Sequence, residues 1–217
     1  MEKAEKSALA VTRILETAFT LFRQYGVRLV TMDEIAARMG MSKKTLYLHF
    51  ADKDELVTRV VQHSVQGIQD LCLTYQQSAG DAIEELLQTM RYLEGFFRNM
   101  NPVVIMDLQK YHPKAYAVFR EHMDGFVLKN IYANLKRGMT EGLYRDNIRM
   151  DIVAKARLET CMICFRPEFF PGDRYEMSQV QQELRLNFLF GLSTLKGYKL
   201  IQRYLKKQTA SETAKTA

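Results

Sequence analysis

A short segment near the N-terminus gathers side chains that donate hydrogen bonds, which is the chemistry of nucleic-acid recognition. Its donors are Lys43, Lys44, Thr45, Tyr47 and His49. Each of them can donate to a phosphate oxygen or to the edge of a base. Leu46 and Phe50 stand four residues apart among them, so one helical face can be buried while the donors stay outside. The spacing predicts a helix whose outer face suits DNA.

Signals on both sides of this segment place it in a helix-turn-helix. Thr31 and Glu34 have the spacing of a capping box, which starts a helix. Gly40 can take the left-handed conformation that ends that helix, and Ser42 is a suitable N-cap for the next one. Asp52 is placed to cap a further helix. Two short helices joined by a glycine-containing turn describe a helix-turn-helix, whose second helix reaches base edges in the major groove through its first residues.

A longer helix, about Ser7–Tyr25, is predicted before this pair. Its apolar residues recur every three or four positions, namely Val11, Ile14, Leu15, Ala18, Phe19, Phe22 and Tyr25. Helices of about eight residues, such as those expected at 32–39 and 43–50, are unstable alone. The long helix must therefore supply the core that holds them.

The positions of three lysines predict their roles on DNA. Lys43 and Lys44 lie in the first turn of the predicted recognition helix, where side chains contact bases. Lys53 begins the next helix, where its side chain and the helix N-terminus could meet one phosphate together. A capped surface helix with solvated lysines is the simpler interpretation. The agreement of caps, turn, spacing and polar face favours DNA binding.

Composition permits this interpretation without deciding it. The 217 residues are 47% hydrophobic and 26% charged, with a net charge of +6 and a pI of about 9.2. Residues 1–60 hold 10 Lys/Arg against 8 Asp/Glu, so most of the excess lies elsewhere. The sequence shows no signal peptide and no apolar run of roughly 18–20 residues that could span a membrane. Three cysteines, an odd number, favour a reducing cytoplasm over a disulfide framework.

The rest of the chain also predicts helices, because prolines and glycines are few and strand-like alternation is nearly absent. The expected ranges are about 53–75, 82–99, 104–111, 114–142, 152–165 and 178–207. With the N-terminal three, the fold class is all-α with about nine helices. The polar last residues predict a flexible tail at 209–217.

Large aromatic and sulfur-containing side chains are dense from about residue 92 to residue 126. The candidates for lining a ligand pocket are Tyr92, Phe96, Met100, Met106, Tyr111, Phe119 and Met123. Methionine adapts to irregular cavities, which favours an apolar pocket between helices. A plain hydrophobic core explains the same residues equally well, and the sequence leaves both open.

Two late helices carry apolar faces that could form half of a four-helix dimer interface. The candidate residues are Leu158, Met162, Phe165, Leu184, Phe188, Leu192 and Leu195. Gly191 and Gly197 would allow close helix approach. The alternative is burial of these residues within one subunit. A dimer also follows from recognition chemistry, because one helix reads few base pairs and a two-fold protein reads two half-sites.

Cys161 and Cys164 have the spacing of a redox or metal pair. They lie in a predicted helix, without the strand of a thioredoxin motif and without the second pair that zinc needs. Buried thiols are the favoured interpretation. The sequence contains no zinc-protease motif, phosphate-binding loop or dinucleotide fingerprint, so we expect neither an enzyme nor a cofactor nor a metal site.

Residues of about 10–57 resemble the N-terminal domain of the tetracycline-repressor (TetR) family of bacterial transcriptional regulators. The resemblance lies in ILETAFTLFRQYG, the Thr31 cap with EIAARMGMS, then KKTLYLHF and ADKDEL. It implies a DNA-binding helix-turn-helix domain at 1–52 and a helical effector-binding and dimerisation domain at 53–208. It also implies phosphate contacts by Thr45, Tyr47, His49 and Lys53, a further backbone contact by Thr31, and base contacts by Lys43 and Lys44. Asp33 departs from relatives that place a base-reading basic residue there; it can favour the helix dipole or accept from a cytosine amino group.

The function implied is a cytoplasmic, homodimeric repressor that binds double-stranded DNA at an operator. A small apolar or amphipathic effector would release it. One alternative is a DNA-binding protein that is architectural or controlled by a protein partner. The other is a helical enzyme or adaptor with a vestigial helix-turn-helix, which would need catalytic geometry that the sequence does not show.

Overall fold

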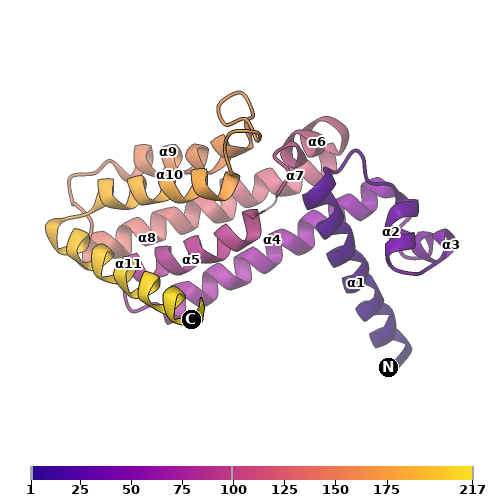
Figure 1. Ribbon diagram of the computed structural model, residues 1–217, viewed down its shortest axis with the longest axis horizontal. Helices are drawn as coiled ribbons and strands as arrows, with labels where there is room; N and C mark the ends of the chain where they lie inside the picture. Colours follow the sequence, from indigo (N-terminus) through magenta and orange to yellow (C-terminus); the bar gives the residue numbers. More distant parts are fainter. Residues whose placement is uncertain (1, 99, 217) are drawn as a thin grey trace.

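The computed structural model describes residues 2–98 and 100–216, and it describes side chains from residue 5 to 98 and from 100 to 208. These residues form helices and no strand, which confirms the predicted all-α class (Figure 1). The helices are α1 (Glu2–Tyr25), α2 (Met32–Arg38), α3 (Lys43–Tyr47), α4 (Lys53–Ser78), α5 (Ala82–Phe97), α6 (Val103–Tyr111), α7 (Pro113–Glu121), η1 (His122–Val127), α8 (Leu128–Thr140), α9 (Met150–Met162), η2 (Ile163–Phe165), α10 (Met177–Leu192) and α11 (Leu195–Thr216). None of the helices in the described ranges is long and apolar enough to cross a membrane.

The short helices α2 and α3 begin with the caps that the sequence predicts. The Thr31 hydroxyl accepts from the Glu34 backbone N–H at 3.2 Å, while the Glu34 carboxylate accepts from the Thr31 N–H at 2.6 Å. The Ser42 hydroxyl accepts from the Thr45 N–H at 3.0 Å at the start of α3. Gly40, between the helices, has the positive φ of 65° that ends α2 sharply. These local bonds fix the angle at which α3 leaves the turn.

Helix α4 extends from beside α2 and α3 into the larger helical body (Figure 1). The Asp52 carboxylate accepts from the Glu55 N–H at 2.7 Å and starts α4 at Lys53. Val57 and Val60 pack in the apolar core that α1, α2 and α3 share. Further along, α4 packs against α5 and α7. The same helix therefore carries part of the N-terminal core and part of the body.

The N-terminal core also receives residues from the middle of the chain. Leu108 of α6 and Ala115 of α7 are buried in the cluster that contains Ile14, Leu46 and Phe50. The N-terminal unit thus shares its core with α6 and α7. The domain boundary predicted between residues 52 and 53 remains a prediction, as does the start of the body.

A π-helical segment interrupts the helix expected at 114–142. Helices α7, η1 and α8 follow one another without a break, and η1 forms the turn at His122–Val127. A π-turn adds one residue to the turn and changes which side chains face inward. His122 and Met123 are buried there as a result. The end expected at Asn99 for the helix before α6 lies outside the described residues.

The single helix expected at 178–207 is two helices in the structure, α10 and α11. Helix α10 stops at Leu192, whose carbonyl accepts from the Arg145 N–H at 2.9 Å, and Thr194 N–H donates to the Leu143 carbonyl at 2.9 Å. The loop after α8 thus binds backbone groups of Leu192 and Thr194 that would otherwise have bonded within one continuous helix. Helix α11 is assigned as far as Thr216, and the tail predicted at 209–217 falls on residues whose side chains are outside the described part.

Candidate DNA interface and buried cavity

Helix α3 lies at one end of the molecule (Figure 1), and the exposed side chains of this short helix are Lys43, Lys44 and Tyr47. Leu46 and Phe50 are buried in the N-terminal core, as their spacing predicts. Lys44 and Tyr47 are exposed on the opposite side. The structure therefore brings the predicted DNA donors of α3 together on a surface that a major groove could receive.

Lys43 is exposed, but its ammonium already has a partner within the chain. Its Nζ lies 2.8 Å from the Asp33 carboxylate of α2 and forms an ion pair across the turn. The hydrogen bond to Asp33 raises the pKa of Lys43. Asp33 therefore has a role that the sequence did not indicate, because it holds a base-reading candidate in place. The two roles expected for Asp33, toward the helix dipole or a cytosine, remain predictions.

The candidate phosphate donors differ in how free they are. The Thr31 hydroxyl takes part in the capping box, and the Thr45 hydroxyl lies 2.8 Å from the hydroxyl of the N-cap serine. Lys53 Nζ donates to the Arg28 carbonyl at 3.1 Å, and burial lowers the pKa of Lys53. His49 is half-buried at the end of the turn that follows α3. Thr31, Thr45 and Lys53 already have hydrogen-bond partners within the chain, so each would share or exchange that partner on binding a phosphate.

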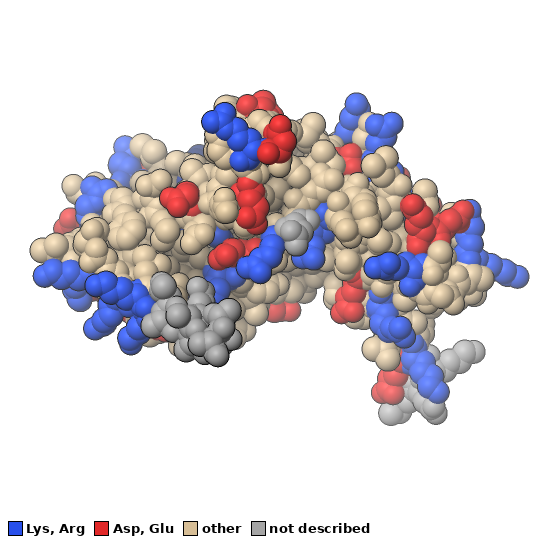
Figure 2. Space-filling view, in the orientation of Figure 1, with Lys and Arg blue, Asp and Glu red and all other residues tan. Residues whose placement is uncertain are grey.

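Basic and acidic side chains are mixed at the end that carries α1 to α3 (Figure 2). The small excess of 10 Lys/Arg over 8 Asp/Glu in residues 1–60 agrees with this picture. Long-range attraction to DNA is therefore modest, and binding depends on where the donors are placed.

Leu48 is a candidate contact that the sequence analysis missed. Its side chain is 76% exposed, although leucine is usually buried. The signal was present in the spacing, because a residue midway between the buried Leu46 and Phe50 must point away from the core. An apolar side chain on a recognition helix can pack against the methyl group of thymine.

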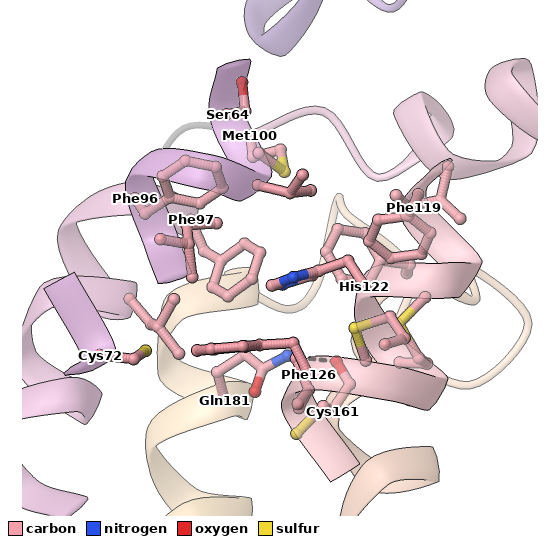
Figure 3. Close-up of a pocket in the computed structure, with 18 of the residues that line it drawn as sticks. Ser64, Cys72, Phe96, Phe97, Met100, Phe119, His122, Phe126, Cys161 and Gln181 are labelled. Atoms are coloured by element: carbon pink, nitrogen blue, oxygen red, sulfur yellow. Dashed lines mark hydrogen bonds between the residues drawn. The ribbon is translucent and has the colours of Figure 1, made fainter. Parts of the chain in front are cut away.

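The second feature is a cavity of about 230 Å³ between the N-terminal unit and the body. Figure 3 shows Phe96 and Phe97 of α5 facing Phe119, His122 and Phe126 across the hollow. Side chains from α1, α4, α6, α8, α9 and α10 also contribute to the wall. This volume is somewhat below the range of typical small-molecule pockets, which run from about 300 to 1,000 Å³. The cavity can hold a small apolar or amphipathic molecule.

Most polar groups in the wall have partners. His122 Nδ1 lies 3.0 Å from the Gln69 amide nitrogen, and burial lowers the pKa of His122 to about 4. Glu85 accepts from Arg137 at 2.9 Å. Arg157 differs, because its buried Nη1 has no hydrogen-bond partner among the described residues. The wall is thus largely apolar, with one buried guanidinium nitrogen that has no partner among the described residues.

The seven predicted pocket residues divide into two groups. Phe96, Met100, Phe119 and Met123 line the cavity. The wall does not include Tyr92, Met106 or Tyr111. Met106 and Tyr111 point outward, because α6 turns Val104, Ile105 and Leu108 toward the N-terminal core. In a helix, neighbouring positions face different sides, and a nine-residue helix can bury only one of them.

Much of the wall comes from residues that the sequence analysis did not propose. Phe19 and Phe22 of α1 were assigned only to the N-terminal core, yet they also face the cavity. Val57, Val60 and Ser64 of α4 line it as well. No pattern in the sequence separates a residue that lines a cavity from one that fills a core, because both are apolar and share a helical face.

The predicted dimer residues are mostly turned inward. Leu158, Phe165 and Leu192 are buried within the chain's own core, which is the alternative that the sequence left open. Met162 and Phe188 line the cavity. Leu184 is half-buried, and only Leu195, at the start of α11, is strongly exposed. The apolar spacing in α9 and α10 therefore marks the side of each helix that faces the chain's own core.

The two cysteines of the C-x-x-C pair lie against α10. Cys164 is buried, and burial raises the pKa of its thiol to about 12. The Gln181 amide donates to the Cys161 carbonyl at 2.7 Å and also contacts Cys164 Sγ. In the described part of the chain, no group of three or more His, Cys, Asp or Glu side chains could hold a metal ion. A buried, protonated thiol is a poor nucleophile and a poor metal ligand.

Comparison with known proteins agrees with this geometry. Residues 14–60 match the family described as "Bacterial regulatory proteins, tetR family". The uncharacterized HTH-type transcriptional regulator YvaF of Bacillus subtilis is 30% identical over 116 residues, which are 53% of this chain and 58% of that protein. The alignment therefore spans less than two thirds of YvaF. The HTH-type transcriptional repressor KstR2 of Mycobacterium tuberculosis is 25% identical over 183 residues, 83% of this chain and 91% of that protein.

Solved structures agree with the fold over most of the chain. KstR2 superposes with a TM-score of 0.61 at 20% identity, covering 85% of this chain and 95% of that one. A putative transcriptional regulator from Saccharomonospora viridis, solved in complex with choline, has a TM-score of 0.68 at 20% identity and covers 86% and 99%. The helical fold agrees with these solved structures, and residues 14–60 place the helix-turn-helix of this chain in the TetR family of bacterial regulatory proteins.

Proposed function

We propose that this regulator is a repressor that binds an operator as a homodimer and leaves it when a small apolar or amphipathic molecule fills the cavity. The observation that carries the proposal is the composition of the cavity wall. Phe19, Phe22 and Val27 come from the N-terminal unit, and Phe97 and Phe119 come from the body. A molecule in the cavity would therefore touch both parts at once.

Helix α6 supplies the mechanical link between the cavity and α3. Ile105 and Leu108 line the cavity, and Leu108 is also buried in the core beneath α3. The Asp107 carboxylate accepts from the Arg28 N–H at 2.8 Å, in the turn between α1 and α2. A shift of α6 on ligand binding would carry that turn with it. The position of α3 would change in consequence.

The energetic requirement is simple. A ligand shifts the protein away from DNA only if it binds the free conformation more tightly than the operator-bound one. A tenfold loss of operator affinity requires about 1.4 kcal/mol of coupling. Repacking a few phenylalanines around a cavity is sufficient for an energy of that size.

The proposed dimer would use the outward faces of α9 and α10. Ile152 of α9 is 56% exposed, and Leu186 of α10 is half-buried at the edge of the chain's own core. A two-fold pairing of these helices would cover both side chains and would place two copies of α3 for two half-sites. A regulator that binds the chromosome acts in the cytoplasm, and we place this protein there.

Fluorescence anisotropy tests the proposal. The full chain is titrated into the DNA that flanks its own gene and into a scrambled duplex, over a salt series. We expect tighter binding to the flanking DNA and a steep salt slope. A set of apolar and amphipathic compounds is then screened for loss of the signal. Equal ligand affinity for free and operator-bound protein would exclude effector release and would favour control by a protein partner.

A further inference from the structure

The cavity wall contains a buried cation without a partner. Arg157 of α9 is 6% exposed and lines the cavity. Its Nη1 has no hydrogen-bond partner among the described residues. Its guanidinium carbon lies 5.2 Å from the centroid of the Phe188 ring, so one face of the group is packed on an aromatic ring. The Nη1 donor needs an acceptor, and the described residues do not provide one.

Carboxylates close to the cavity are already engaged. The buried Glu85 accepts from Arg137 at 2.9 Å, and Glu94 lies 3.8 Å from Arg98. No carboxylate in the described ranges forms an ion pair with Arg157. His122, the buried imidazole in the wall, is neutral near pH 7 because burial lowers its pKa to about 4. The positive charge of Arg157 is therefore uncompensated.

A second buried arginine adds to the positive potential. Arg185 of α10 is 2% exposed and donates to two neutral acceptors, the carbonyls of Gln181 at 3.0 Å and Met90 at 3.1 Å. Burial, and then repulsion from Arg157, lowers the pKa of Arg185 to about 10. Glu94 is near enough to act in the opposite direction on the pKa of Arg185, but no carboxylate in the described ranges forms an ion pair with either guanidinium. Two neighbouring buried cations without an ion pair are costly unless an anion joins them.

We propose that the cavity takes an amphipathic acid, whose apolar body lies among the phenylalanines and whose oxyanion head group accepts hydrogen bonds from Arg157. As a statement about the effector, this inference rests on the function proposed above. An arginine fork matches the geometry of a carboxylate or a phosphate. The positive charge of Arg157 would repel a quaternary ammonium compound. The cavity therefore selects by charge among molecules of one length.

Isothermal titration calorimetry on the full chain tests the proposal with four probes of equal chain length, all below their micelle concentrations. They are decanoate, decyl phosphate, 1-decanol and decyltrimethylammonium. The wild-type chain should bind one of the two anions at least about tenfold more tightly than decanol, which is the size of one charge-assisted hydrogen bond. The stronger anion distinguishes a carboxylate from a phosphate ligand.

Three variants separate the roles of charge and shape. Arg157→Met should lose the preference for the anion and bind decanol within about twofold of wild type. Arg23→Met is the matched control, because Arg23 also lines the cavity but is half-buried and has its guanidinium 5.9 Å from the Phe19 ring centroid. It should keep the preference. Phe119→Ala should weaken decanoate and decanol by the same factor, since it changes only the apolar wall.

Two results would overturn the inference. One is a wild-type chain that binds decanol or decyltrimethylammonium as tightly as the anions. The other is an Arg157→Met chain that keeps the anion preference. If Arg157→Met does not fold, Arg157→Gln replaces it as the variant that removes the charge. The comparison of the four probes on the wild-type chain then tests the anion preference independently. Operator binding, measured separately by anisotropy, shows whether the proposed function fails while the anion site stands.

Discussion

At the residue scale, Lys43 and Asp33 face each other across the two helices of the helix-turn-helix, 2.8 Å apart. Both side chains are well exposed, so the pair contributes little to folding. Its effect lies in recognition, because an ammonium held by a carboxylate is less available to a base or a phosphate. The Asp33 carboxylate also offsets the positive charge that Lys43 would otherwise present to DNA.

Asp33→Asn should therefore strengthen DNA binding. The change frees Lys43 and removes one repulsive charge, so affinity for any duplex should rise by roughly three- to tenfold at low salt, with a steeper dependence on salt. Anisotropy at several salt concentrations measures both. A drop in affinity confined to one operator sequence would instead mean that Asp33 accepts a hydrogen bond from a base.

Tyr47 and Leu48 are exposed neighbours that we expect to act differently. Tyr47→Phe removes a phosphate donor and should weaken binding to all sequences alike. Leu48→Ala should reduce affinity only for sites that place a thymine methyl beneath α3, by about 1 kcal/mol. Selection of binding sites from random DNA compares the two variants. Identical sequence preferences for wild type and Leu48→Ala would remove Leu48 from base recognition.

His122 should make stability depend on pH. Its folded-state pKa is lowered from 6.5 to about 4 by burial, so the unfolded chain binds the proton more readily. The folded state favours the neutral imidazole of His122. The contribution of this residue to folding stability is therefore complete above about pH 6.5 and is lost as the pH falls toward 4. The loss from this residue alone is about 3 kcal/mol. His122→Gln should flatten the melting temperature between pH 6.5 and 4 relative to wild type, as measured by circular dichroism; an unchanged pH profile would contradict this account.

At the element scale, helix α8 and the loop that follows it are locked together around a glycine. A Cβ on Gly138 would overlap the ring of Tyr144, which is buried and donates from its hydroxyl to Asn134 Oδ1 at 3.0 Å. The same loop supplies the hydrogen bonds that separate α10 from α11. One small residue thus permits the packing that ends a helix far along the chain.

Gly138→Ala should cost about 1–3 kcal/mol of folding stability, because the added methyl group forces the Tyr144 ring out of its site. Gly67→Ala is the matched control. Gly67 is an exposed glycine inside α4 with no neighbour that would meet a Cβ, so alanine there should stabilise by about 0.5–1 kcal/mol. Urea unfolding of both variants measures the difference. A Gly138→Ala chain as stable as wild type would show that the ring can move at no cost.

The π-turn η1 is the element that gives the cavity its shape. His122, Met123, Phe126 and Val127 all belong to it and all line the cavity. A regular α-helix would distribute these four side chains over a wider arc. Segments of this kind occur often at functional sites, which agrees with the role proposed for the cavity.

At the scale of the whole molecule, the N-terminal unit and the body share apolar packing. The cluster that holds α3 continues into α6 and α7, and the cavity lies beside it. Occupation of the cavity and the position of α3 are therefore coupled through packed side chains. Two copies of the chain would be needed to bind two half-sites with this arrangement.

The double variant Ile152→Glu and Leu186→Glu tests the proposed dimer. Placing carboxylates at the exposed Ile152 and at the partly exposed edge of α10 should convert a dimer to a monomer and lower operator affinity at least about a hundredfold. Light scattering after gel filtration gives the mass. Leu73→Glu is the control, because Leu73 is a 43% exposed leucine on α4, away from those helices. A double variant that stays dimeric would place the interface elsewhere.

The sequence by itself determined the helix-turn-helix and the family. Caps, a glycine turn and apolar spacing act between residues that lie within a few positions of one another, so Thr31, Gly40, Ser42 and Asp52 indicate the helix starts and the turn without any knowledge of the rest of the chain. The all-α class follows from the same local rules.

Only the tertiary structure decided which apolar residues line a cavity, which form the core and which remain exposed. Leu158 and Leu192 satisfied the spacing expected of an interface but are buried within the chain, while Phe19 and Val60 contribute to the N-terminal unit and to the cavity at once. The Lys43–Asp33 pair, the break before α11 and the unpartnered Arg157 depend on contacts between residues distant in sequence or on the absence of such contacts. Periodicity shows that a side chain faces inward, but the element it meets there is set by how the helices pack.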